Sequence, residues 1–171
     1  LTAVRSRSEM LGRHLIESLA ISPFIRGRQV VDVGSGAGLP GVPLAIANPA
    51  VQYTLLDSNG KKSRFLFEVK RALMLSNVEI ETVRVESWQP TRRFDSVVTR
   101  AFADLATTLA RVDHVLSDQG MVYAMKTEQA QHEIDALPDA TRQVTAQNIN
   151  VPGRDWPFQL LAVQPRVEAA L

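Results

Sequence analysis

Residues 30–41 read Val-Val-Asp-Val-Gly-Ser-Gly-Ala-Gly-Leu-Pro-Gly, and this stretch decides the fold of the chain. The β-branched run at 29–33 predicts a buried strand. The four glycines that follow allow a sharp turn and present no Cβ to keep a ligand away. The apolar residues 42–47 then predict a short helix with prolines at its start, where a missing N–H does no harm. A strand, a glycine loop and a helix N-terminus together predict a cradle for a nucleotide-like ligand.

The composition limits the class of protein. A length of 171 residues fits one domain, and the absence of cysteine excludes disulfides, thiolate zinc sites and cysteine nucleophiles. No apolar run approaches the roughly 18 residues that a membrane span needs, and no signal peptide is visible. We therefore expect a cytoplasmic protein with no bound metal and no membrane partner. Because the chain starts at Leu1 rather than at methionine, we also expect N-terminal sequence to be missing.

Strands and helices alternate along the chain. The predicted strands are residues 29–33, 51–56, 78–85, 94–99, 121–125, 142–149 and 158–163. The predicted helices are residues 9–20, 42–47, 61–76, 104–116 and 127–137. This order predicts an α/β fold, a doubly wound and mostly parallel seven-stranded sheet whose last two strands form an antiparallel edge hairpin. We expect a single domain over 1–171, with an N-terminal helical segment at 1–28 and the sheet at 29–171.

The first predicted helix, residues 9–20, has apolar residues at helical spacing. They are Met10, Leu11, Leu15, Ile16 and Leu19. This spacing predicts that they share one apolar face of the helix.

Asp32 distinguishes between the ligands that such a loop could hold. The glycines Gly36, Gly38 and Gly41 match a dinucleotide fingerprint, but Gly34 already closes the strand, so the register is wrong. A pyrophosphate above this loop would also face the nearby carboxylate of Asp32. S-adenosylmethionine carries no phosphate, and its ammonium and sulfonium groups are cationic. We therefore predict S-adenosylmethionine as cofactor, bound at Asp32, Gly34, Gly36 and Gly38.

Two further strand ends suit an adenosine ligand. Asp57 ends the second strand a little over 20 residues after the loop, where a carboxylate can accept hydrogen bonds from both ribose hydroxyls. Val85 and Glu86 end the third strand, where Val85 would pack on the adenine ring and Glu86 would read its edge. A local turn at Asp57 and a solvated strand end at Glu86 are the alternatives.

Arg100 and Lys126 end the fourth and fifth strands, on the side where chemistry occurs in such sheets. Amide- and adenine-directed methyltransferases usually have Asn/Asp-Pro-Pro-aromatic at the fourth strand, whereas residues 99–102 read Thr-Arg-Ala-Phe. A target with its own lone pair, such as a ring nitrogen, needs no base, so catalysis reduces to positioning and electrostatics. We predict that Arg100 and Lys126 act by positioning the reacting groups.

These residues resemble those of the ribosomal RNA small subunit methyltransferase G family, also called glucose-inhibited division protein B. The resemblance covers roughly the first two thirds of the chain, and its most distinctive parts are Gly-Leu-Pro-Gly at 38–41 and Arg-Ala-Phe-Ala at 100–103. The matching stretches are residues 1–5, 9–11, 13–14, 32–41, 55–58, 61, 64–66, 84–86 and 100–103. Two departures are the lack of a helical segment before Leu1 and a threonine, Thr127, where members have glycine after Lys126.

The resemblance implies a class I, Rossmann-like methyltransferase that transfers a methyl group from S-adenosylmethionine to N7 of one guanine in bacterial small-subunit (16S) rRNA. It implies cofactor contacts from Gly34, Leu39, Val85, Glu86 and Arg100. On this reading Arg100 would help to orient the cofactor, and Lys126 would hold a phosphate or the guanine carbonyl.

The basic N-terminal region is the candidate RNA surface. Arg5, Arg13 and His14 precede the sheet and are expected, with Lys126, to meet RNA phosphate, although solvated helix charge explains them equally well. We expect a monomer that acts on RNA presented by the ribosomal particle. Three alternatives remain at this point: a methyltransferase for a small molecule, an NAD-dependent oxidoreductase, and a silent adenosine-binding subunit.

Overall fold

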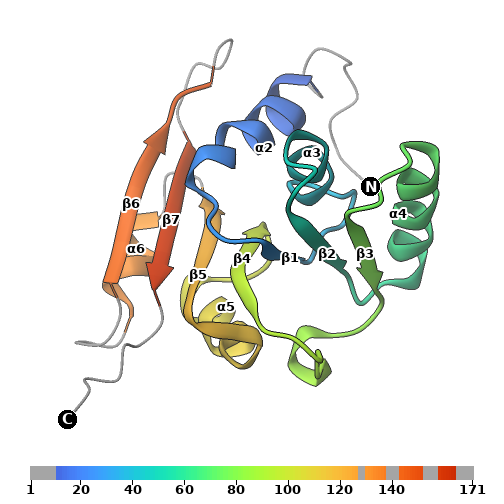
Figure 1. The fold of residues 1–171 in the computed structure, drawn as a ribbon. Helices are drawn as coiled ribbons and strands as arrows, with labels where there is room; N and C mark the ends of the chain where they lie inside the picture. The colour runs from blue at the N-terminus through green and yellow to red at the C-terminus, as the bar shows by residue number, and fades with distance from the viewer. Residues whose placement is uncertain (1–10, 127–129, 138–142, 152–157, 165–171) are drawn as a thin grey trace.

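Seven strands form one sheet in the order β3-β2-β1-β4-β5-β7-β6 in the computed structural model (Figure 1). The structure describes residues 11–126, 130–137, 143–151 and 158–164, with side chains from residue 14 onward. The strands are β1 (Gln29–Val33), β2 (Gln52–Leu56), β3 (Val78–Glu81), β4 (Phe94–Arg100), β5 (Leu116–Lys126), β6 (Gln143–Ile149) and β7 (Phe158–Gln164). The first five are parallel, and β7 pairs antiparallel with both β5 and β6. The predicted doubly wound sheet with an antiparallel edge hairpin is confirmed.

Helices cover both faces of this sheet. They are η1 (Leu11–Ile16, a π-helix), α2 (Glu17–Ala20), α3 (Gly41–Ala47), α4 (Gly60–Ala72), α5 (Leu105–Val112) and α6 (Ala130–Asp135). Short 3₁₀ turns lie at η2 (Ser22–Phe24), η3 (Val85–Ser87) and η4 (Asp113–Val115). In Figure 1, α4 lies at one end of the molecule, beside β3, and β6 lies at the other.

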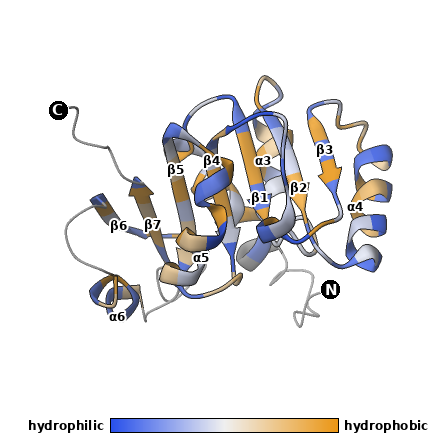
Figure 2. Ribbon diagram, turned by 90° about the horizontal axis from the view of Figure 1, so that it is seen from below, coloured by the Kyte–Doolittle hydropathy of each residue, from blue (hydrophilic) through white to orange (hydrophobic). Residues whose placement is uncertain are grey.

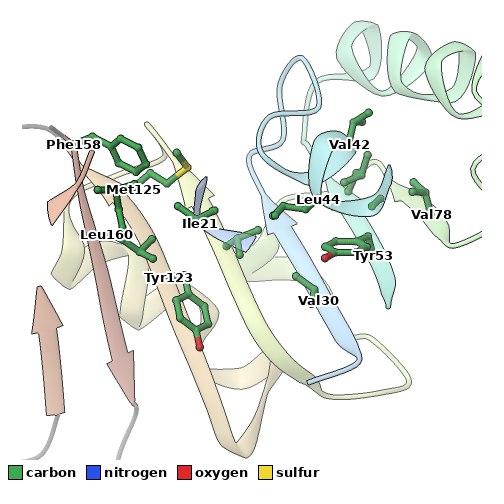
Figure 3. Packing of buried hydrophobic residues seen from close by; sticks show 14 of the residues in the cluster. Ile21, Val30, Val42, Leu44, Tyr53, Val78, Tyr123, Met125, Phe158 and Leu160 are labelled. Atoms are coloured by element: carbon green, nitrogen blue, oxygen red, sulfur yellow. The ribbon is translucent and has the colours of Figure 1, made fainter. Parts of the chain in front are cut away.

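Two apolar clusters hold the layers together. On one face, Ile21, Leu44 of α3 and Leu66 of α4 pack on Val30 and Tyr53 (Figure 3). On the other face, Leu105, Leu109 and Val112 of α5 pack on Val31 and Val33. Residues 30–33 are all completely buried, as a central parallel strand requires, and Figure 2 shows the central strands as mostly hydrophobic.

The segment before β1 is tied to the first half of β4. The carboxylate of Asp95 accepts hydrogen bonds from the backbone N–H groups of Arg28 (2.7 Å) and Gln29 (2.9 Å). The hydroxyl of Ser96 donates to the carbonyl of Arg26 at 2.7 Å. These bonds satisfy backbone groups that β1 pairing alone would leave open.

Four predicted elements differ from the observed ones by four or five residues at one end. The third strand ends at Glu81 rather than at 85, and Val85 opens a 3₁₀ turn instead. Helix α4 ends at Ala72 rather than at 76, and α5 ends at Val112 rather than at 116. Strand β5 begins at Leu116 rather than at 121. Predicted residues 127–129 and 142 lie outside the described residues.

The apolar residues predicted to share one face of the first helix are exposed where the structure describes their side chains. Leu15 and Leu19 are each 42% exposed, whereas Glu17 and Ser18 are buried. The reason is an ion pair between Glu17 and Arg100, which turns the polar side of the helix toward the sheet.

Candidate functional site

A cavity of about 240 Å³ opens at the carboxyl ends of the central strands. Its walls come from the ends of β1, β2 and β4, from the turn at η3 and from α5. The lining residues are Gly34, Leu56, Asp57, Ser58, Lys62, Val83, Arg84, Val85, Glu86, Ala101, Phe102 and Arg111. The strand order reverses between β1 and β4, and ligands of open α/β sheets bind at this kind of switch point.

Gly34 begins the glycine loop and forms part of the cavity wall. Its φ angle is +77°, and a Cβ there would lie 2.9 Å from the Phe102 ring. Only glycine therefore suits this position, both for its backbone and for the close approach of the ring. The N–H of Gly34 donates to the carbonyl of Leu56 at 2.8 Å, which fixes the start of the loop to the end of β2.

Asp57 ends β2 and joins three segments at the cavity. Its side chain accepts hydrogen bonds from the N–H groups of Gly36 (3.0 Å) and Asn59 (2.8 Å). The ammonium of Lys62 lies 3.5 Å from the same carboxylate. This carboxylate lines the cavity, and it also fixes the glycine loop.

Asp32 is buried below the loop. Its Oδ2 accepts a hydrogen bond from the N–H of Gly41 at 2.9 Å, and its Oδ1 has no hydrogen-bond partner among the described residues. Burial raises the pKa of Asp32 to about 7. A cationic group bound nearby would favour the ionised form of this buried carboxylate, because the positive charge offsets its desolvation.

The other loop residues shape the cradle from behind. The N–H groups of Gly38 and Leu39 donate to the carbonyl of Ser35 at 2.7 and 3.1 Å. A Cβ on Gly38 would lie 2.6 Å from Val42, so this glycine is required for packing against α3. Gly36, Gly38, Leu39 and Asp32 thus form the loop and its support rather than the cavity wall.

Glu86 lies in the cavity wall beside Arg111, which reaches it from α5. The guanidinium Nε lies 3.0 Å from a Glu86 carboxylate oxygen. The same guanidinium stands 5.8 Å from the centroid of the Phe102 ring, in a cation–π arrangement. Arg111 therefore links the residue predicted to read adenine with the ring that packs on Gly34.

Arg100 ends β4, and its guanidinium pairs with Glu17 at 3.0 Å. The next residue, Ala101, has a φ of 52°, in the left-handed region that non-glycine residues rarely occupy. Such strain is concentrated at functional sites. The turn at Ala101 follows Arg100 directly and leads to Phe102, which lines the cavity.

Lys126 ends β5 at the same edge of the sheet. Its ammonium donates to the carbonyl of Ala103 at 2.7 Å and pairs with Glu133 at 2.7 Å. Glu133 also accepts from the N–H of Leu105 at 2.6 Å. Lys126 and Glu133 therefore hold the loop that connects β4 to α5.

The predicted RNA residues are only partly described. Arg5 and the side chain of Arg13 lie outside the described residues. His14 is half-buried, and its carbonyl accepts a hydrogen bond from the Ser18 hydroxyl at 2.5 Å.

Sequence reasoning identified four of the cavity residues, Gly34, Asp57, Val85 and Glu86, and missed the rest. Phe102 could have been found, because it follows Arg100 within a distinctive stretch. Arg111 could not, because its approach depends on how α5 packs.

Among the described residues, no group of three histidine, aspartate or glutamate side chains could hold a metal ion. Within the same residues, no helix is both long and apolar enough to cross a membrane.

Comparison with known proteins assigns the family. The family model described as rRNA small subunit methyltransferase G matches residues 1–157. This chain belongs to that family.

The names of curated relatives agree with this assignment. The chain is 42% identical over 166 residues to Ribosomal RNA small subunit methyltransferase G of Nitrosococcus oceani, covering 97% of this chain and 78% of the relative. The protein of the same name from Stutzerimonas stutzeri is 46% identical over 166 residues, covering 96% of this chain and 77% of the relative.

Solved structures support the fold. A SAM-dependent methyltransferase from Aquifex aeolicus superposes with a TM-score of 0.68 at 17% identity, covering 91% of this chain and 93% of that one. The predicted family, the class I fold and a methyltransferase that uses S-adenosylmethionine are confirmed. The oxidoreductase alternative is not favoured.

Proposed function

We propose that this chain transfers a methyl group from S-adenosylmethionine to N7 of a guanine in bacterial small-subunit (16S) rRNA. The observation that carries the proposal is the cavity at the switch point, which brings together Gly34, Asp57 and Glu86 in a chain of the rRNA small subunit methyltransferase G family. The names of the curated relatives support small-subunit rRNA as the substrate.

The residues at the site fit the cofactor. Gly34 leaves room for close approach, Asp57 would bind the ribose, and Val85 and Glu86 would bind the adenine. Asp32 lies behind the glycine loop rather than in the cavity wall, and its Oδ1 has no hydrogen-bond partner among the described residues, so a cationic cofactor group would act on it through charge rather than by contact. When bound, S-adenosylmethionine would supply an electrophilic methyl group to the lone pair of the ring nitrogen.

The chain itself would act by positioning. Residues 99–102 offer no Asn/Asp-Pro-Pro-aromatic motif for an exocyclic amine, and a ring nitrogen needs no base. Arg100 would orient the cofactor, while Arg5, Arg13 and His14 would meet RNA phosphate. For Lys126, an RNA phosphate would have to compete with Glu133, its partner at 2.7 Å.

We propose that the protein works as a monomer in the cytoplasm on RNA within the ribosomal particle.

Methyl transfer to purified small subunits tests this function. Subunits and naked rRNA from a strain lacking the gene are incubated with the protein and labelled S-adenosylmethionine, and the label is mapped by chemical cleavage at N7-methylguanine. We expect one labelled guanine, with subunits preferred over naked rRNA. Absence of label from both RNA substrates would refute the proposal, and label recovered only in small metabolites would favour the small-molecule alternative.

A further inference from the structure

The helical segment formed by η1 and α2 buries the carboxylate of Glu17 and exposes Leu15 and Leu19. The side chain of Glu17 is 5% exposed, whereas Leu15 and Leu19 are each 42% exposed. A helix that merely covered a sheet would have the opposite arrangement, because burial of apolar surface is what stabilises such packing. Burying a carboxylate costs free energy unless it is paired. The orientation of α2 is therefore set by the partner of Glu17.

That partner is Arg100, at the carboxyl end of β4. Oxygen Oε2 of Glu17 lies 3.0 Å from a terminal guanidinium nitrogen, and the Arg100 side chain is 24% exposed. In the pairing of β1 with β4, Val33 lies opposite Thr99, so Arg100 stands at the level of Gly34. The ion pair thus reaches from α2 to the switch point, next to the cavity.

We infer that Glu17 is a positioning residue that holds Arg100 at the switch point, so that helix α2 is part of the cofactor site. The inference rests on the proposed function, in which Arg100 orients S-adenosylmethionine. An arginine side chain loses rotamer entropy when it is fixed in one conformation. Because Glu17 fixes Arg100 before the cofactor arrives, less of this entropy is lost on binding, and affinity is higher.

A double-mutant cycle measured by calorimetry with S-adenosylhomocysteine tests this role. The four proteins are wild type, Glu17→Gln, Arg100→Gln and the double variant. We expect Glu17→Gln to weaken binding about tenfold in the wild-type background and less than twofold in the Arg100→Gln background, since contacting residues are not additive. Glu17→Asp keeps the charge, so it should bind S-adenosylhomocysteine at least threefold more tightly than Glu17→Gln does.

Ser18→Ala is the matched control, because Ser18 is buried on the same helix and its hydroxyl donates to the His14 carbonyl instead. We expect its affinity to stay within twofold of wild type. An equal loss for Glu17→Gln in both backgrounds, or no loss in either, would overturn the inference.

Wild-type protein supplies a second measurement if Glu17→Gln fails to fold. Coupling between two sites is reciprocal, so bound S-adenosylhomocysteine should slow hydrogen exchange at the backbone amides of residues 14–20. Unchanged exchange there would overturn the inference. Wild-type protein that binds no S-adenosylhomocysteine would refute the proposed function and this inference with it. Binding without methylation of RNA would refute only the RNA assignment.

Discussion

Asp32 makes the stability of this protein depend on pH in an unusual direction. Burial raises its pKa from 3.8 to about 7, so the folded chain holds a proton that the unfolded chain releases between those values. Stability therefore falls as pH rises from about 4 to about 7, by at most roughly 4 kcal/mol. Asp32→Asn should remove this fall, and urea unfolding at pH 5 and pH 8 measures it.

Asp104 provides a control of opposite sign. The N–H of Thr107 donates to its carboxylate and lowers the pKa of Asp104, so its contribution is present at neutral pH and lost in acid. Asp104→Asn should flatten the acid side of the curve only. Equal pH dependence in wild type and Asp32→Asn would contradict the prediction for Asp32.

Gly41 can be compared with Gly60, because both begin helices and neither has a positive φ. A Cβ on Gly41 would lie 2.3 Å from Leu55 and 2.7 Å from the Asp32 carboxylate, whereas a Cβ on Gly60 would meet nothing within 4 Å. Gly41→Ala should lower the free energy of unfolding by about 1–3 kcal/mol through overpacking. Gly60→Ala should raise it by about 0.4–1 kcal/mol. Urea unfolding of both variants checks this, and similar effects from both would contradict it.

At the scale of elements, α4 ends in a Schellman motif with a residue poorly suited to it. The N–H of Met74 donates to Arg71 and that of Leu75 donates to Lys70, which places Met74 in the left-handed position with a φ of 51°. Met74 is 87% exposed, so little packing is lost on replacement. Met74→Gly should therefore raise the free energy of unfolding by about 1 kcal/mol. Thermal melts of wild type and Met74→Gly check this prediction. A lower Tm for Met74→Gly would contradict it and would show that the methionine side chain is needed.

The elements also show what sequence reasoning can reach. The run at 29–33 and the alternation of strands with helices determined the sheet, because burial on both faces leaves a local pattern. The face of α2 could not be predicted, because Glu17 is turned inward by a residue far along the chain. The same limit applies to the site. Gly34 and Asp57 have local signatures, whereas Arg111 reaches the cavity only through the packing of α5.

At the scale of the whole molecule, cofactor binding should stabilise the fold. A ligand that binds only the folded state at 100 times its Kd adds about 2.7 kcal/mol. For a domain of this size, that corresponds to an increase in Tm of about 5–11 °C. We expect this shift with S-adenosylhomocysteine in thermal melts and none with NAD at the same concentration. The reverse result would favour an oxidoreductase and contradict the methyltransferase assignment.

Strand β4 is bound along its length to the segment that precedes β1, through Asp95, Ser96 and Arg100. This has a consequence for the order of events during synthesis. The three bonds that Asp95 and Ser96 make to this segment span 66–70 residues of sequence. At about 5–20 residues per second, Glu17 leaves the peptidyl transferase centre roughly 4–17 s before Arg100 is made. The amino-terminal helix is therefore translated early but can take its final place only after the fourth strand has emerged.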